Sequence, residues 1–258
     1  MKLHMILRNA LIIALMLTFF NCKEETKKPV TSETAEDIIN KSINAAGGDV
    51  FDHSNINFDF RDIHYKAQRD SGKFRLERYI KDSVTEIKDV LSNSGFERFE
   101  KDAKVELSDS LVALYSASVN SVHYFSVLPY GLDGGAVFKE DLGTEEIKGT
   151  NYHKIKVTFA EDGGGEDHED EFLYWINKNT YNVDYLAYSY EEVDGMGYRF
   201  REAYNARMVN GLRFVDYNNY KPTSVNFNFE DLGLMFKNGE LELLSKIELS
   251  NITVEQFN

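Results

Sequence analysis

The chain has 258 residues, of which 42% are apolar and 13% aromatic, and this composition indicates a globular protein rather than a disordered one. Its formal net charge is −14. A surface of that sign repels nucleic acid and anionic lipid headgroups, so we expect no nucleic-acid partner. The length fits one domain of the larger all-β or α+β kind.

The first 21 residues have the layout of an export signal. Lys2 and Arg8 stand in a stretch without acidic residues, and an apolar run follows over residues 10–20. This run is shorter than the roughly 20 residues that a membrane-spanning helix needs. It ends just before Cys22, the only cysteine, so no disulfide can form within the chain. We predict a signal peptide over residues 1–21, whose removal changes the net charge from −14 to −16.

The run up to Cys22 resembles the lipobox of bacterial lipoproteins, in which the cysteine is diacylated and becomes residue one of the mature chain. The usual pattern has Leu three places before the cysteine and Gly or Ala directly before it, whereas Phe19 and Asn21 stand here. The resemblance implies that acyl chains such as palmitate on Cys22 anchor the protein to a membrane. The alternative is an ordinary secretory signal with a free thiol.

Residues 22–32 are polar and unpatterned, which predicts a flexible tether. Its first residues after the cysteine, Lys23-Glu24-Glu25, resemble a signal that carries some Gram-negative lipoproteins to the outer face of the outer membrane. The alternative is that these charges belong to a solvated linker. The predicted localisation is therefore the cell envelope, with a lipid anchor in the outer membrane. The sequence leaves both the inner and the outer face of that membrane as alternatives.

Apolar residues at helical spacing predict a first helix from near Ser32 to the glycine pair Gly47-Gly48. A second helix is predicted over residues 108–125 and is ended by Pro129. Between and after the helices, strands are predicted at residues 55–61, 74–80, 84–91, 96–107, 152–160, 171–176, 183–190, 198–209, 212–220 and 241–254. Asn210-Gly211 is the clearest hairpin turn.

Two of these strands, residues 171–176 and 183–190, carry bulky apolar or aromatic residues on both parities. Both faces of the sheet therefore need cover. About ten antiparallel strands and two main helices predict an α+β fold, either a curved antiparallel sheet or an unclosed β-barrel, with the helices covering or plugging it.

A lipid cysteine, a first helix ending in Ala-Ala-Gly-Gly, a long meander with one helical interruption, and IKGTNYHKIKVTF leading into DEFLYWINKNTYNVDYLAYSY resemble lipoproteins of the lipoprotein-carrier (LolA/LolB-like) superfamily. Within it, the chain is most similar to a group of uncharacterised outer-membrane lipoproteins. The resemblance covers most of residues 33–254. It implies that residues 33–258 are one domain, an unclosed β-barrel whose apolar cavity receives acyl chains in the best-known members.

Aromatic residues on the more apolar strand parity, or on the parity of His168, are the candidates for the walls of such a cavity. They are Phe58, Phe60, Phe172, Tyr174, Phe200 and Tyr204. A barrel of this size leaves interior volume that helices or a ligand must fill, and the ligand would be a lipid or another hydrophobic small molecule. The alternative is that these rings pack on the two helices and form a solid core.

Residues 161–171 combine glycines with many acidic side chains. A calcium loop is disfavoured because the oxygen ligands fall out of register, so we expect a solvated hairpin tip and no metal. His168 and Asp170 are polar candidates for the site. Asp167, Glu169 and Glu171 are expected to pair across the sheet with three arginines of one strand parity, Arg199, Arg201 and Arg207. The alternative is that these arginines form a cationic clamp for a headgroup or a uronic acid.

Catalysis has little support in the sequence, because Gly-x-Ser-x-Gly, His-Glu-x-x-His and phosphate-loop motifs are absent. We expect a non-enzymatic protein without a cofactor. A hydrolase would need His153, His168 and Asp170 within reach of one metal.

A second non-enzymatic class remains open. It is an accessory lipoprotein that binds glycan or protein through exposed aromatic residues, namely Tyr174, Trp175, Tyr188 and Tyr190. Asp82-Ser83 and Asp109-Ser110 also resemble a short acceptor motif for bacterial O-glycans, and the second of these doubles as a helix cap.

Overall fold

The computed structural model describes residues 33–257 except residues 85, 164–168 and 193–194. The predicted signal peptide, Cys22, Lys23-Glu24-Glu25 and the tether lie outside the described residues. Glu33–Asn258 form one compact unit. No helix within the described part of the chain is both long and apolar enough to cross a bilayer.

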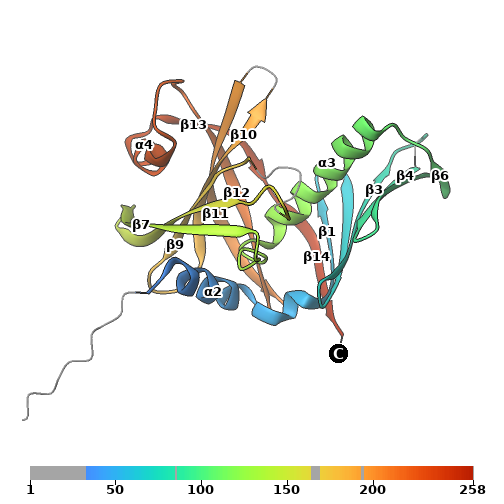
Figure 1. The fold of residues 1–258 in the computed structure, drawn as a ribbon, viewed down its shortest axis with the longest axis horizontal. Helices are drawn as coiled ribbons and strands as arrows, with labels where there is room; N and C mark the ends of the chain where they lie inside the picture. The colour runs from blue at the N-terminus through green and yellow to red at the C-terminus, as the bar shows by residue number, and fades with distance from the viewer. Residues whose placement is uncertain (1–32, 85, 164–168, 193–194, 258) are drawn as a thin grey trace, which may run out of the picture. The chain divides into compact units, whose positions relative to one another are not determined.

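Two seven-stranded antiparallel sheets form the body of this unit (Figure 1). The first has the order β14-β1-β2-β3-β4-β5-β6 and the second the order β13-β12-β11-β10-β9-β8-β7. The strands of the first sheet are β1 (His53–Phe60), β2 (Ile63–Asp70), β3 (Lys73–Lys81), β4 (Glu86–Ser92), β5 (Gly95–Glu100), β6 (Ala103–Val105) and β14 (Leu249–Gln256). Those of the second are β7 (Val137–Ile147), β8 (Thr150–Phe159), β9 (Phe172–Asn177), β10 (Val183–Glu192), β11 (Gly195–Val209), β12 (Leu212–Pro222) and β13 (Leu241–Ile247).

The two sheets are joined where β13 passes into β14, with Glu248 alone between them. Arg207 Nη2 donates to the carbonyl oxygen of Leu249 at 2.7 Å, and the Leu249 amide donates to Asp216 Oδ1 at 3.0 Å. These bonds hold the start of β14 against the second sheet. The outer strands β6 and β7 do not pair with each other among the described strands, so the predicted unclosed architecture is confirmed. The described residues form fourteen strands rather than about ten.

The first helix, α2 (Ala35–Ala46), begins and ends as its sequence predicts. Thr34 and Asp37 form a capping box, in which each side chain accepts from the other residue's backbone amide. The helix stops at Gly47, whose φ of 139° suits glycine, and whose Cα lies so close to Leu212 that a side chain would collide with it. The helix buries Ile38 and Ile39 on the second sheet.

The second predicted helix is α3 (Asp109–Val127), which lies along the first sheet (Figure 1). A short helix, α4 (Leu232–Asn238), was not predicted, and neither were the 3₁₀ turns η1 (Gly48–Asp52) and η2 (Phe229–Asp231). Helix α4 packs Leu232 and Met235 against Trp175 and Phe200 on the face of the second sheet opposite to α2. This sheet is therefore covered on both faces, as the apolar residues on both parities predicted.

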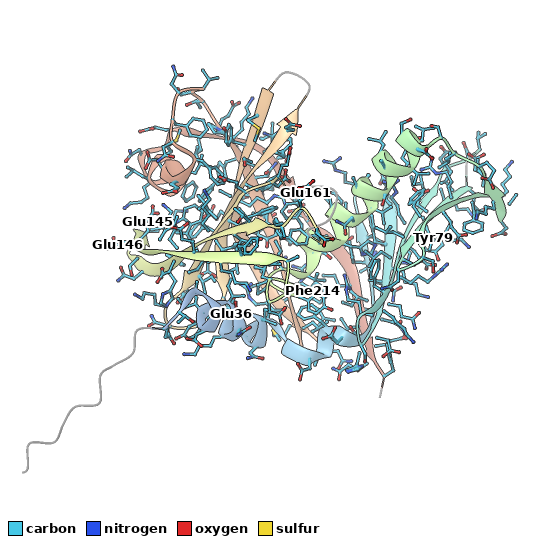
Figure 2. All side chains as sticks on the ribbon, viewed as in Figure 1. Glu36, Tyr79, Glu145, Glu146, Glu161 and Phe214 are labelled. Atoms are coloured by element: carbon cyan, nitrogen blue, oxygen red, sulfur yellow. The ribbon has the colours of Figure 1, made fainter. Side chains whose placement is uncertain are left out.

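A third cluster lies between the first sheet, the middle of α3 and the start of β12. It contains Phe58, Tyr65, Val119 and Phe214. Figure 2 labels Phe214 near the middle of the molecule. Residues from both sheets therefore share one core with α3, and this core holds the two sheets together.

Candidate ligand-binding pocket

A pocket of about 240 Å³ lies between α3 and the segment where the chain passes from β13 into β14, and it is partly open to solvent. Its apolar lining consists of Phe60, Val122, Phe125, Val215, Tyr217, Ile247 and Leu249. Its polar lining consists of Arg61, Ser121, Ser126, Arg201, Asn219 and Ser245. The walls thus come from α3, from both sheets and from the junction between the sheets.

The periodicities of the elements explain which residues face this space. On α3, Val122 and Ser126 are four residues apart and share one side of the helix. On β12, Val215, Tyr217 and Asn219 alternate with residues that point to the other face of the sheet. Burial raises the pKa of Tyr217, so its phenol stays neutral and is able to donate a hydrogen bond.

Arg201 is the most unusual group in the pocket. Its side chain is buried, with 7% of the residue exposed. The guanidinium lies over the Phe125 ring, with Cζ 3.8 Å from the ring centroid, and 5.0 and 5.8 Å from the centroids of Tyr188 and Tyr217. Nη2 donates to the Tyr188 hydroxyl at 2.8 Å. Aromatic rings, rather than an acid, surround this cation.

Arg201 also has unused hydrogen-bonding capacity. Its Nε is buried and has no hydrogen-bond partner in the described part of the chain. The same holds for Oδ1 of Asn219, whose Nδ2 donates to Ser245 Oγ at 3.1 Å. None of the thirteen described lining residues is acidic, although the chain contains 43 acidic residues. The interior of the pocket therefore combines apolar walls with one unneutralised positive charge.

The six aromatic residues predicted as walls do not come together in one place. Phe60 lines the pocket, whereas Phe58 stacks on Tyr65 in the core shared by both sheets. Phe172 and Tyr174 are buried in the core beneath α2. The wall prediction needs correction at Phe200, which lies on the opposite face beside Trp175, because strand β11 turns the even-numbered residues away from Arg201. Tyr204 lies at the surface and donates to Glu248 at 2.7 Å.

The expected ion pairs between the arginine-rich strand and residues 167–171 need correction at Glu171 and at Arg207. Glu171 pairs with Lys156 on its own side of the sheet, with the two charged atoms 3.1 Å apart. Arg207 pairs with Asp216 at 3.0 Å. Arg199 lies over the Tyr190 ring, and Arg201 faces the pocket. Asp167 and His168 fall outside the described residues.

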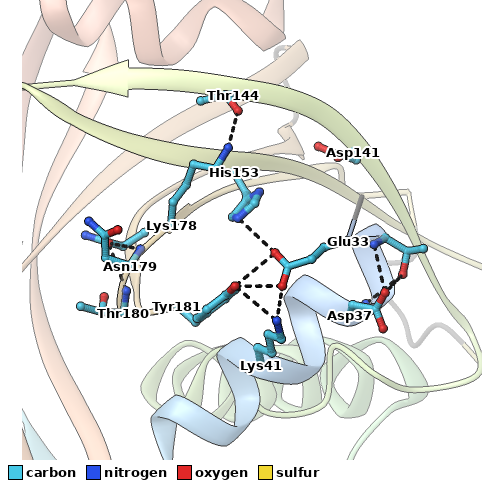
Figure 3. Close-up of polar contacts among 12 residues, drawn as sticks. Glu33, Asp37, Lys41, Asp141, Thr144, His153, Lys178, Asn179, Thr180 and Tyr181 are labelled. Carbon is cyan, nitrogen blue, oxygen red and sulfur yellow. Dashed lines mark hydrogen bonds and ion pairs between the residues drawn. The ribbon is translucent and has the colours of Figure 1, made fainter. Parts of the chain in front are cut away.

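His153, a residue that a metal-dependent hydrolase would need, belongs to a polar network at the start of α2 (Figure 3). Its Nε2 lies 3.7 Å from Glu33 Oε2. Glu33 also accepts hydrogen bonds from Lys41 and from the Tyr181 hydroxyl, and the bond from Lys41 is the main cause that lowers the pKa of Glu33. Burial lowers the pKa of His153. The network joins the first residue of the compact unit to β8, and the described residues contain no metal-ligand cluster.

The prediction that four exposed aromatic residues bind a glycan or protein partner is wrong for two of them, because these two are buried. Tyr174 and Trp175 are fully buried, and the Trp175 indole donates to Glu145 at 3.0 Å. Figure 2 labels Glu145 at the edge of the second sheet. Tyr188 and Tyr190 are half-buried. The O-glycan motifs Asp82-Ser83 and Asp109-Ser110 are both exposed.

Sequence reasoning missed most of the pocket. The predicted apolar stripe of α3 did include Val122 and Phe125. The sequence pattern, however, does not indicate that these residues face β12 to β14. Asn219, Ser245 and Leu249 carried no motif. The one sequence feature that could have indicated the pocket is Arg201, a positively charged residue on a strand rich in aromatic residues.

The chain is similar to several solved structures at low sequence identity. A LolA superfamily protein from Nitrosomonas europaea is 13% identical, with a TM-score of 0.49, over 88% of this chain and 96% of that chain. A DUF1329 family protein from Desulfovibrio piger is 11% identical, with a TM-score of 0.48, over 86% and 93%. A putative outer membrane lipoprotein-sorting protein domain from Vibrio parahaemolyticus is 8% identical, with a TM-score of 0.41, over 78% and 97%.

Identities and TM-scores this low support no conclusion about the superfamily or the function of this chain. No curated protein matches the chain. A family model does match it, over residues 14–249, and is described as a family of unknown function, DUF6503. This match spans most of the sequence, and the chain therefore belongs to the DUF6503 family.

Proposed function

We propose that this protein is a non-enzymatic lipoprotein of the outer membrane that binds a lipid or another hydrophobic ligand in the pocket between α3 and the β13–β14 junction. The observation that carries the proposal is the pocket itself, which is partly open and has mostly apolar walls. Apolar pockets with a few convergent polar groups are the usual form of small-molecule sites.

The volume of the pocket limits what it can hold. At about 30 Å³ for each water-sized group, 240 Å³ accommodates roughly eight non-hydrogen atoms. An acyl chain of that length fits inside. The remainder of a longer chain would lie at the mouth, beside Phe60 and Leu249, which are only partly buried.

The lipid anchor is a separate part of the proposal and rests on the apolar run that ends at Cys22. Metabolic labelling with a palmitate analogue tests it, because wild type should be labelled and Cys22→Ala should not. Equal labelling of the two proteins would reject the anchor. Outward exposure is tested by protease treatment of intact cells, and full protection of the chain would place it on the inner face.

Ligand binding is tested by mass spectrometry of organic extracts from natively purified residues 33–258. This segment is one compact unit with its own hydrophobic clusters, so we expect it to fold without the preceding residues. A matched pair of variants controls the experiment. Ser121→Trp fills the pocket, whereas Asn120→Trp adds the same side chain to the exposed side of α3.

We expect a lipid in extracts of wild type and Asn120→Trp, and at least a tenfold smaller amount in extracts of Ser121→Trp. A lipid that co-purifies equally with both variants would show that it binds elsewhere. The absence of any hydrophobic compound from wild type would contradict the proposed function and would leave a surface interaction module as the alternative.

A further inference from the structure

The charge inside the pocket indicates the chemistry of the ligand's head. We propose that the pocket takes an anionic amphiphile, whose carboxylate or phosphate binds the guanidinium of Arg201 while its alkyl chain lies against Val122, Phe125 and Leu249. This inference rests on the proposed function and adds the class of ligand to it.

The first argument is that Arg201 is buried without a counterion. Only 7% of the residue is exposed, and no carboxylate in the described part of the chain lies within ion-pair distance of it. Its one hydrogen bond in the same set of residues goes to the Tyr188 hydroxyl, and its Nε has no partner. An isolated buried cation is costly unless it is paired and hydrogen-bonded. An anionic ligand supplies both the charge and the acceptors.

The second argument comes from the other buried arginines, most of which have a carboxylate. Arg78 and Arg98 share Asp89, with charged atoms 2.5 and 2.6 Å apart. Arg69 is the described exception, and it lies over the Tyr130 ring away from the pocket. In so acidic a chain, a buried arginine without an acid that also faces an open pocket is the expected form of an anion site.

The third argument is that the surroundings favour an anion and can complete its coordination. The described lining contains no acidic residue to repel it, and exposed Arg61 adds a second positive charge at the mouth. Asn219 lies on the same wall with its buried Oδ1 unpaired. A flip of this amide leaves Oδ1 to accept from Ser245 and turns the Nδ2 donor to the pocket. Arg201 and Asn219 together would then hold one acidic group.

The test compares ligands of equal chain length and different heads. Decanoate, decyl phosphate, 1-decanol and inorganic phosphate are titrated into residues 33–258 by calorimetry, in the wild type, Arg201→Gln and Arg199→Gln. Arg199 is a matched control because it is an arginine two residues away on β11 that does not line the pocket. Circular dichroism melting curves establish that each variant is folded.

We expect wild type and Arg199→Gln to bind decanoate or decyl phosphate about tenfold more tightly than 1-decanol, since a hydrogen bond to a charged group is of that size. In Arg201→Gln this preference should disappear while 1-decanol binding changes less than about threefold. The relative affinity of the two anions identifies a carboxylate or a phosphate head.

Equal binding of decanoate, decyl phosphate and 1-decanol to wild type would overturn the inference and leave the proposed function intact, and this comparison needs no variant. A preference for anions that survives in Arg201→Gln would also overturn it. Inorganic phosphate that binds as tightly as decyl phosphate would show a site for free anions rather than for amphiphiles. If no ten-carbon compound binds, the proposed function itself fails.

Discussion

The guanidinium carbon of Arg201 lies 3.8 Å from the centre of the Phe125 ring. This contact connects β11 of the second sheet to the end of α3, a helix that packs on β3, β4 and β5 of the first sheet and also contacts β12 of the second. Both residues line the pocket, so the contact also forms part of its wall. Arg201 and Phe125 therefore contribute both to the packing of α3 on the second sheet and to the positive charge in the pocket.

A double-mutant cycle with Phe125→Leu and Arg201→Met measures this contact. We expect a coupling energy of about 0.5–2 kcal/mol, because a cation over an aromatic ring is worth that much when it is partly desolvated. Urea unfolding followed by circular dichroism supplies the four free energies. The pair Lys88 and Phe99, with Nζ 4.7 Å from the ring centroid on the first sheet, is the control and should couple at the low end of that range. A coupling near zero for Arg201 and Phe125 would contradict the account.

Asp89 is fully buried between Arg78 and Arg98 and should be the most sensitive carboxylate of the first sheet. Asp89→Asn leaves two buried cations without a counterion, which should lower the free energy of unfolding by about 3–5 kcal/mol. Glu86→Gln, on the same strand, breaks an exposed pair with Lys81 and should cost about 0–1 kcal/mol. Equal effects of the two changes in urea unfolding would contradict the claim that the buried pairs of Asp89 stabilise the protein more than the exposed pair of Glu86.

His123 should make the stability depend on pH. Burial lowers the pKa of this histidine from 6.5 to about 3, so below pH 6.5 the unfolded chain binds a proton that the folded chain does not. The stabilising contribution is therefore complete above pH 6.5 and decreases as the pH falls toward 3. Between pH 7 and pH 5 we expect this group to lower the free energy of unfolding by about 2 kcal/mol.

The matched variants for this prediction are His123→Gln and His53→Gln. Glutamine at position 123 keeps a donor for the carbonyl oxygen of Glu77, to which His123 Nε2 is bonded at 3.1 Å, but does not titrate. Urea unfolding at pH 7 and pH 5 should show about 2 kcal/mol less acid sensitivity in His123→Gln than in wild type. His53 is exposed, and His53→Gln controls for the replacement of a histidine at the surface. Identical pH dependence in all three proteins would refute the assignment.

Gly233 allows α4 to approach the second sheet. A Cβ at this position would lie 2.5 Å from Glu145 Oε1 and 2.7 Å from Trp175 Cζ2. We expect Gly233→Ala to lower the free energy of unfolding by about 1–3 kcal/mol and to change the fluorescence of Trp175, the only tryptophan. Gly135→Ala meets no atom within 4 Å and should be nearly neutral. Unchanged fluorescence in Gly233→Ala would mean that α4 does not pack on Trp175.

The sequence predicts this fold well where one face of an element is strongly apolar. Helix α2, with its cap at Thr34 and its stop at Gly47, is an example. Strand β2 escaped prediction because its buried residues, Tyr65, Ala67 and Arg69, include a small residue and a cation. Strand β7 escaped because it is largely exposed and acidic. In both strands, pairing with neighbours outweighs local preference.

The pocket was harder to predict than the fold, because its walls meet only through tertiary contacts. The register of β9 to β11 decides that Arg201 shares a face with Tyr174 while Phe200 does not. Sequence parity within one strand cannot supply that register, since it depends on the bulge between Val183 and Tyr185. Arg201 itself was identified from the sequence, which favoured a pair with acids across the sheet and left a cationic clamp for a headgroup or a uronic acid as the alternative.

The most direct test of ligand binding in this pocket is a titration of residues 33–258 with decanoate, followed by NMR of labelled methyl groups. The residues Val122, Val215 and Leu249 line the pocket, whereas Val90 is buried on β4 and Leu232 lies in the cluster beside Trp175, so the methyl groups of these two serve as controls. We expect the pocket methyl signals to shift together and to saturate, while the control signals stay in place. No shift at the pocket methyl groups, or larger shifts at Leu232 than at Val122, would contradict the account.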